Sequence, residues 1–349
     1  MQVSKKEGRV LNNAINKWVE NGVISAAQSS ELKESYVVTP FDWKRLARYS
    51  FWLAIVCVLI AISSLLADKW LLVLLATLFT APEVVKCAFF TALATLLYYL
   101  GVRRKAGQPG RVYSNEAIFF LAVAATAAAI AYLGMVMDNG SGHFSLLLLL
   151  AALVYALLGL WFPSRLVWLF ALLALGSWFG AETGYASGWG AYYLGMNYPL
   201  RFVAFALVLL ACGSFVFGRW HNRSGFWGVT KAVGLLYLFV ALWLLSIFGN
   251  YGEQAGWFRA GQAELLFWSL LFAVAAGVAI WHGLKQDDGM SRGFGLVFIF
   301  INLYTRFFEY FWGGTHKAVF FALLALSFWY LGSRAEKIWQ LSLLKSRRE

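Results

Sequence analysis

Long apolar runs, each of about twenty residues, recur between residues 50 and 332 and constrain the fold more than any other feature of the sequence. About twenty apolar residues form a helix long enough to cross the hydrocarbon core of a bilayer, which is roughly 30 Å thick. Hydrophobic residues make up 61% of the 349 positions and charged residues only 13%, whereas a soluble domain has about 25% charged residues. The sequence therefore predicts an all-α, polytopic integral membrane bundle. It excludes a disordered chain, a nucleic-acid-binding domain and a disulfide scaffold.

The apolar runs predict about ten transmembrane helices. They lie at about 50–67, 83–101, 116–137, 144–161, 165–180, 199–217, 227–248, 264–282, 294–312 and 317–332. The stretch Trp70–Thr80 is also apolar, but about eleven residues are too few for a helix to cross the hydrocarbon core. We interpret this stretch as re-entrant or interfacial. Three regions follow: a cytosolic helical hairpin at 1–42, a transmembrane bundle at 43–332 and a basic cytosolic tail at 333–349.

Basic residues are unevenly distributed over this topology. Of the 29 Lys and Arg residues, 23 fall on the side of the N-terminus, 5 fall on the opposite side, and Arg306 lies within a span. Because Lys and Arg collect in cytoplasmic loops, both termini are predicted to be cytoplasmic. The same bias accounts for the net charge of +12 without a nucleic-acid partner. Residues 1–42 contain no short apolar region with a cleavage site, so we expect no cleavable signal peptide.

Residues 1–42 have the pattern of two short helices. The first has an apolar stripe formed by Val10, Leu11, Ala14, Ile15 and Trp18. Asn21 and Gly22 are typical of a helix stop, and Ser25 followed by Gln28 is a capping-box signature for a second helix. We expect the pair to pack on itself, on the membrane surface or on a cytosolic protein.

The ninth predicted span carries three polar side chains, Asn302, Arg306 and Glu309. Their spacing of four and then three residues places them on one helical face. Ionisable groups are costly in hydrocarbon, so this face should turn toward the bundle interior. One interpretation is a structural Arg–Glu pair that locks helices together. The other is a binding site in which Arg306 holds an anionic or carboxylate group and Glu309 tunes it or relays protons.

The predicted outer segment 181–201 is rich in Gly and Tyr and carries Glu182, Tyr198 and Arg201. Tyr and Trp are enriched at membrane interfaces, so an aromatic belt is one interpretation. The alternative is a lid or vestibule over a cavity that leads to Arg306 and Glu309. On this second view, the three residues complete a ligand-binding set with Asn302, Arg306 and Glu309.

Signatures of enzymes and metal sites are absent from the sequence. His143, His221, His282 and His316 are scattered, without HExxH or a Cys–His ligand spacing. There is no GxxxxGK[ST] loop and no GxSxG elbow. The spacing of His282 and Asp287 resembles that of some membrane-associated acyltransferases, but no other acyltransferase motif accompanies it. The sequence favours a protein that is not an enzyme, and it predicts no catalytic residue, no cofactor and no metal.

Several segments resemble one family. They are NAINKWVENGVIS with AAQSSEL near the N-terminus, FGAETGYASGWGAYYLGMNYPLRF, and INLYTRFFEYFWGGTHKAVFFALLALSFWYLGSRAEKIW. Together they resemble bacterial predicted membrane proteins grouped as domain of unknown function 2157. The resemblance implies a bacterial cytoplasmic (inner) membrane protein with a cytosolic N-terminal helical domain, and it transfers no activity.

Two functional hypotheses follow. The first is binding or transport of a small or lipid-like solute through an intramembrane cavity, with membrane lipids as further partners. The alternative is a non-catalytic scaffold or sensor that recruits a cytosolic protein through residues 1–42.

Overall fold

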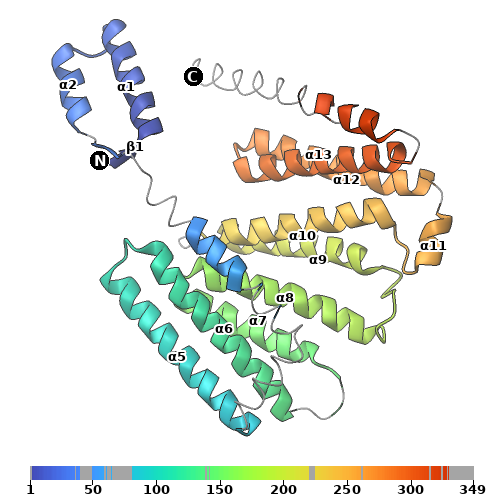
Figure 1. Cartoon of the computed structure of the whole chain (residues 1–349). Helices are drawn as coiled ribbons and strands as arrows, with labels where there is room; N and C mark the ends of the chain where they lie inside the picture. Colours follow the sequence, from blue (N-terminus) through green and yellow to red (C-terminus); the bar gives the residue numbers. More distant parts are fainter. Residues whose placement is uncertain are drawn as a thin grey trace. The chain divides into compact units, whose positions relative to one another are not determined.

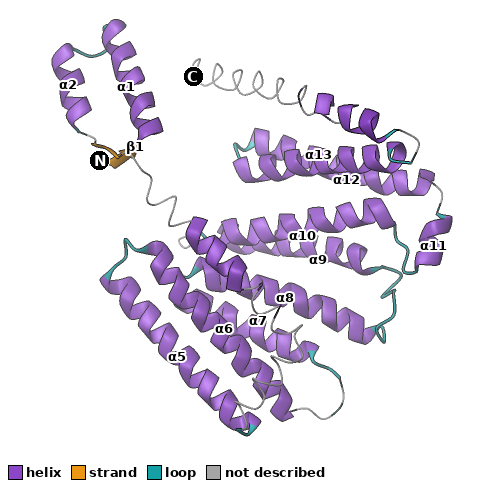
Figure 2. Ribbon diagram, viewed as in Figure 1, coloured by secondary structure: helices purple, strands orange, loops and turns teal. Residues whose placement is uncertain are grey.

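The computed structural model describes residues 2–35, 37–39, 49–58, 60, 64, 81–137, 140, 142–219, 225–260, 262–313, 316–323, 325–327 and 329. Helices dominate this part of the chain, as Figure 2 shows, and the only named strands in it are two of three residues each. The predicted all-α class is confirmed. The chain divides into two compact units, Met1–Met137 and Asp138–Glu349.

The first unit begins with helices α1 (Lys5–Glu20) and α2 (Ala26–Glu34), drawn in blue in Figure 1. Gly22, between them, has a φ of +69°, a left-handed conformation that glycine adopts easily. The predicted capping box is confirmed: Ser25 N donates to Gln28 Oε1 at 2.9 Å, and Gln28 N donates to Ser25 Oγ at 3.3 Å. Two parallel strands, β1 (Gln2–Ser4) and β2 (Val37–Thr39), flank these helices in the sequence.

The same unit contains a closely packed pair of helices, α5 (Glu83–Gly107) and α6 (Val112–Met137). Small residues on α6, including Ala122, Ala125 and Ala129, are buried. Small side chains let two helix backbones approach closely in a membrane. These alanines therefore allow α5 and α6 to pack closely.

In the second unit, the short helix Lys317–Ser327 follows seven labelled helices, visible in Figure 1. They are α7 (Ser145–Trp161), α8 (Arg165–Ala186), α9 (Tyr198–Arg219), α10 (Phe226–Phe248), α11 (Gln254–Arg259), α12 (Gln262–Lys285) and α13 (Gly289–Phe311). Helix α10 packs against α8, α9, α12 and α13. The rings of Phe239, Phe272 and Phe298 are buried where α10, α12 and α13 meet, and the Phe239 and Phe298 centroids lie 5.0 Å apart. This aromatic core fixes the three helices that carry the polar side chains described below.

Seven helices in the described chain are long and apolar enough to cross a membrane: α5, α6, α8, α9, α10, α12 and α13. Three shorter apolar helices, Tyr49–Val58, Ser145–Trp161 and Lys317–Ser327, coincide with the other predicted spans. Length and composition therefore support a multi-pass protein, but only seven of the ten predicted crossings. The predicted re-entrant segment Trp70–Thr80 and the tail 333–349 lie outside the described residues.

Candidate functional site

The candidate residues from the sequence all belong to the second unit. Glu182 lies in the last turn of α8, Tyr198 and Arg201 lie in the first turn of α9, and Asn302, Arg306 and Glu309 lie in the carboxyl-terminal half of α13. Helices α8, α10 and α13 end, and α9 and α12 begin, near α11 (Figure 1). We call this the α11 end of the unit. The contacts divide the candidates into three clusters.

Asn302 joins α13 to α12. Its buried Oδ1 accepts a hydrogen bond from Ser269 Oγ at 2.7 Å, and its Nδ2 donates to Ser269 O at 2.8 Å. The inward orientation predicted for Asn302 is therefore present. Both ends of the amide are paired within the protein, so a ligand would have to displace Ser269 to reach it.

Arg306 joins α13 to α10 near the α11 end. Its Nη2 donates to Ser246 O at 2.6 Å, and its Nη1 forms an ion pair with Glu309. The side chain of Arg306 is 12% exposed and that of Glu309 is 33% exposed. A cation at the last turn of α10 is favourable because the carboxyl end of a helix carries partial negative charge. The Nε atom of Arg306 is buried and donates to no group in the described chain.

Two tryptophans stabilise the surroundings of Arg306. Trp243 Nε1 donates to Thr305 Oγ1 at 3.0 Å, which links α10 to the residue before Arg306. Trp257 Nε1, on α11, donates to Ile247 O at 2.9 Å, beside the Ser246 carbonyl. Sequence reasoning missed these residues, because a tryptophan in an apolar run looks the same whether it faces lipid or a polar partner. Ser246, three positions after Trp243, is the one polar side chain in the run ALWLLSIF and could have drawn attention to this face.

Arg201 forms the second cluster with Tyr198. The Arg201 side chain is only 1% exposed, and it donates to the carbonyl oxygens of Met196 (2.9 Å), Thr183 (3.3 Å) and Ala191 (3.2 Å). Its guanidinium carbon lies 4.5 Å from the centroid of the Tyr198 ring. These contacts bind the segment between α8 and α9 to the ends of both helices, and they occupy Nε and both terminal nitrogens of the guanidinium.

The segment that precedes α9 and the segment that follows α10 are hydrogen-bonded to each other at the α11 end. Asn197 Nδ2 donates to Gly249 O at 2.8 Å, and Asn197 N donates to Asn250 Oδ1 at 2.9 Å. Asn250 Nδ2 donates to Gly195 O at 3.0 Å, and Tyr192 OH donates to Asn250 O at 3.1 Å. This cross-linking favours a fixed loop over the mobile lid considered from the sequence.

Glu182 forms the third cluster with residues at the start of α7. Its Oε2 accepts a hydrogen bond from Ser145 Oγ at 2.6 Å and lies 2.9 Å from His143 Nε2. The His143 ring stacks on Tyr185, with centroids 3.9 Å apart. Sequence reasoning did not connect His143 with Glu182, because they are 39 positions apart and no motif links them. Within the described residues, no group of three or more His, Cys, Asp and Glu side chains could hold a metal ion.

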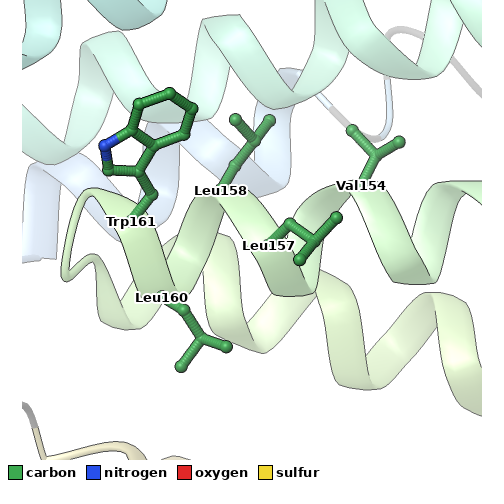
Figure 3. Close-up of a pocket in the computed structure, with 5 residues that line it drawn as sticks. All are labelled: Val154, Leu157, Leu158, Leu160 and Trp161. Atoms are coloured by element: carbon green, nitrogen blue, oxygen red, sulfur yellow. The ribbon is translucent and has the colours of Figure 1, made fainter.

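An apolar groove of about 650 Å³ lies on α7, and none of the six candidates lines it. Its lining, drawn in Figure 3, consists of Val154, Leu157, Leu158, Leu160 and Trp161. A surface of this composition in a membrane helix matches lipid chains. The indole N–H of Trp161 is the one polar side-chain group among these five residues, and the lining carries no charged side chain.

The fold and these contacts define a class of protein. Seven apolar helices of spanning length, with polar side chains turned toward one another, fit a multi-pass membrane protein. Comparisons with protein-family models, with curated proteins and with solved structures find no match to the chain.

Proposed function

We propose that this chain is a bacterial inner-membrane protein that binds, and in doing so can transport, a small or lipid-like solute at the α11 end of its second unit. The proposal includes ten spans with both termini in the cytoplasm and membership of the family described as domain of unknown function 2157. The short apolar helices at 49–58, 145–161 and 317–327 support the higher span count, because each coincides with a predicted span.

One observation carries the proposal: Arg306 is a mostly buried cation with an unused donor. A buried N–H without an acceptor costs free energy, and such groups in folded proteins call for an explanation. An ionisable side chain within a membrane helix is most often functional. A solute that presents an oxygen acceptor to Arg306 Nε would account for both features, and the partly exposed Glu309 marks the side from which the solute approaches.

A thermal-shift screen tests this proposal. The purified full-length protein in neutral detergent is melted with a panel of membrane lipids and metabolites, because a ligand that binds the folded state raises its melting temperature. A stabilising ligand should lose its effect in Arg306→Gln. The matched control is Arg292→Gln, an exposed arginine at the other end of α13. Full stabilisation of a folded Arg306→Gln protein would place the solute elsewhere.

The second candidate, a scaffold or sensor, is favoured by a different observation. Helices α1 and α2 and the turn between them leave Val10, Trp18, Val23 and Leu32 exposed. Exposed apolar side chains of this kind are typical of protein contacts when they gather on one surface. Deletion of residues 1–42 should then abolish pull-down of a cytosolic partner and leave the membrane part folded. Trp18→Asp should have the same effect, whereas the control Asn13→Asp, at another exposed position of α1, should not.

A further inference from the structure

We infer that the Glu309 carboxylate is an internal substitute for the anionic group of the solute. On this view a carboxylate or phosphate group displaces Glu309 from Arg306 when the solute binds. The inference rests on the proposed function and adds the chemical class of the ligand and the role of Glu309. It concerns residues on α10, α12 and α13, together with the segment that follows α13.

The donor arrangement of Arg306 is the first argument. A guanidinium has five N–H donors and recognises carboxylate and phosphate through two parallel hydrogen bonds. Arg306 uses Nη2 for Ser246 O, Nη1 faces Glu309, and Nε is buried without an acceptor. The contact between Arg306 and Glu309 is therefore made through one nitrogen. An incoming anion that takes the place of Glu309 can pair end-on with Nη1 and the second N–H of Nη2, which gives two parallel hydrogen bonds where Glu309 makes one contact, and a further oxygen of the solute can then reach Nε.

The difference in burial is the second argument. Arg306 is held between helices by the Ser246 carbonyl, whereas Glu309 is about three times as exposed and lies in the last turn of α13. The Glu309 carboxylate can move into water, whereas the mostly buried Arg306 cannot be left without a negative partner at small cost. Glu309 therefore leaves when the incoming anion takes over the charge of Arg306, whose Nη1 is then available to the solute.

The third argument is the set of charges and rings beside Glu309. Lys317 lies over the Trp312 ring, 3.8 Å from its centroid, and adds a second cation just after α13. Another carboxylate at this end, Glu264 on α12, accepts a hydrogen bond from the Tyr251 hydroxyl instead of pairing with a cation. Phe308 and Trp312 stack near Glu309 and are exposed, so an alkyl chain attached to the anion would meet apolar surface. An anionic amphiphile fits this combination.

The test measures binding of defined probes to the full-length protein in neutral detergent. Dodecanoate and phosphatidic acid represent the lipid source, acetate and inorganic phosphate represent the free anion, and dodecanol is the uncharged control. Glu309→Gln should bind the effective anionic probe about fivefold more tightly than the wild type, because a competing carboxylate has been removed. Glu309→Asp should give a smaller gain, and Arg306→Gln should abolish binding. The matched control Glu264→Gln should bind like the wild type.

The outcomes separate the inference from the function on which it rests. If Glu309→Gln, shown to be folded by gel filtration, binds the anions no more tightly than the wild type, then Glu309 is not a substitute for the ligand. If dodecanol binds as well as dodecanoate and still requires Arg306, the solute site stands but the ligand is not an anion. If no probe and no member of the wider panel stabilises the wild type, both the inference and the proposed function fail. Glu309→Asp decides the question if Glu309→Gln does not fold.

Discussion

Asp288 shows how a single carboxylate connects two elements. It is the N-cap residue of α13, where its Oδ1 accepts from Met290 N at 3.2 Å, and it also forms an ion pair with Lys231 on α10. Burial alone would raise the pKa of Asp288, but hydrogen bonds from Lys231 and Ser291 outweigh burial and lower the pKa to about 2 from the usual 3.8. A carboxylate whose pKa is lower in the folded state stabilises that state above the unfolded pKa. The contribution is lost as the pH falls from about 4 through 2.

The lowered pKa of Asp288 predicts how the stability of the protein depends on pH. The difference between 3.8 and about 2 corresponds to at most about 2 kcal/mol of unfolding free energy, and solvent screening reduces this to about 1 kcal/mol, present at neutral pH and lost in acid. Asp288→Asn should therefore be less stable than the wild type at pH 7, and the gap should close between about pH 4 and pH 2. Asp287→Asn is the matched control, because it leaves the pair with Lys231 intact. A gap between wild type and Asp288→Asn that stays constant down to pH 2 would contradict the prediction.

At the scale of elements, Gly295 on α13 lies where α12 and α13 cross closely. A Cβ atom added at Gly295 would lie 2.6 Å from Ala276 O and 2.9 Å from Ile280 N. Both are backbone atoms of α12, so no side-chain rotation can relieve the clash. Gly293, on the same helix, has no neighbouring atom within 4 Å of the corresponding position. Gly295 therefore lies against the backbone of α12, whereas Gly293 on the same helix faces open space and serves as its control.

Gly295→Ala should lower the unfolding free energy by about 1–3 kcal/mol, the usual cost of forcing extra atoms into a packed interface. Gly293→Ala should leave stability unchanged or slightly raised, since alanine favours a helix more than glycine does. Thermal unfolding of both variants in the same detergent measures the difference. Equal melting temperatures for the two variants would mean that α12 and α13 do not cross as closely as described.

The helices themselves were largely predictable from the sequence, because apolar length alone specifies a membrane helix. Several helices continue past the predicted spans, and α8 is informative because it continues to Ala186 instead of ending near 180. Glu182 and Thr183 look like loop residues, yet within the helix Thr183 Oγ1 donates to Phe179 O and Glu182 is paired with α7. A helix can continue through polar residues when their side chains form hydrogen bonds. When the hydrogen-bond partner lies on another helix, the sequence shows no periodic pattern that would reveal it.

Only the α13 residues of the candidate site were predictable from the sequence, and their partners on α10 and α12 were not. Helical spacing predicted that Asn302, Arg306 and Glu309 all turn inward; Asn302 is buried and Arg306 mostly buried, whereas Glu309 is partly exposed at the end of α13. Their partners Ser269 and Ser246 lie 33 and 60 positions away in the sequence. Only the packing of α10, α12 and α13 brings these residues together in space. No local pattern marks a serine whose backbone carbonyl accepts from a distant arginine.

At the scale of the whole molecule, the remaining question is which helices cross the bilayer and in which direction, and α6 offers the most direct test. Its 26 residues correspond to about 39 Å of helix, longer than a hydrocarbon core of roughly 30 Å. Arg104 lies at the end of α5 and donates to Ser114 Oγ, in the first turn of α6, at 3.1 Å. Gly140 follows the other end of α6. The proposed topology, with its excess of basic residues near Arg104, predicts that this end of α6 is cytoplasmic.

We therefore predict that cysteine labelling separates the two positions. In a background with Cys57, Cys87 and Cys212 replaced, Arg104→Cys should react with a membrane-impermeant maleimide only after cells are permeabilised, whereas Gly140→Cys should react in intact cells. Gel filtration controls for folding, since Gly140 has a φ of +74° and a side chain there is strained. Labelling of both positions from one side would mean that α6 does not cross the membrane. The proposed topology puts the ends of α8, α10 and α13 on the outer face. The loss of one crossing at α6 would reverse that assignment and would put Arg306 near the cytoplasmic face.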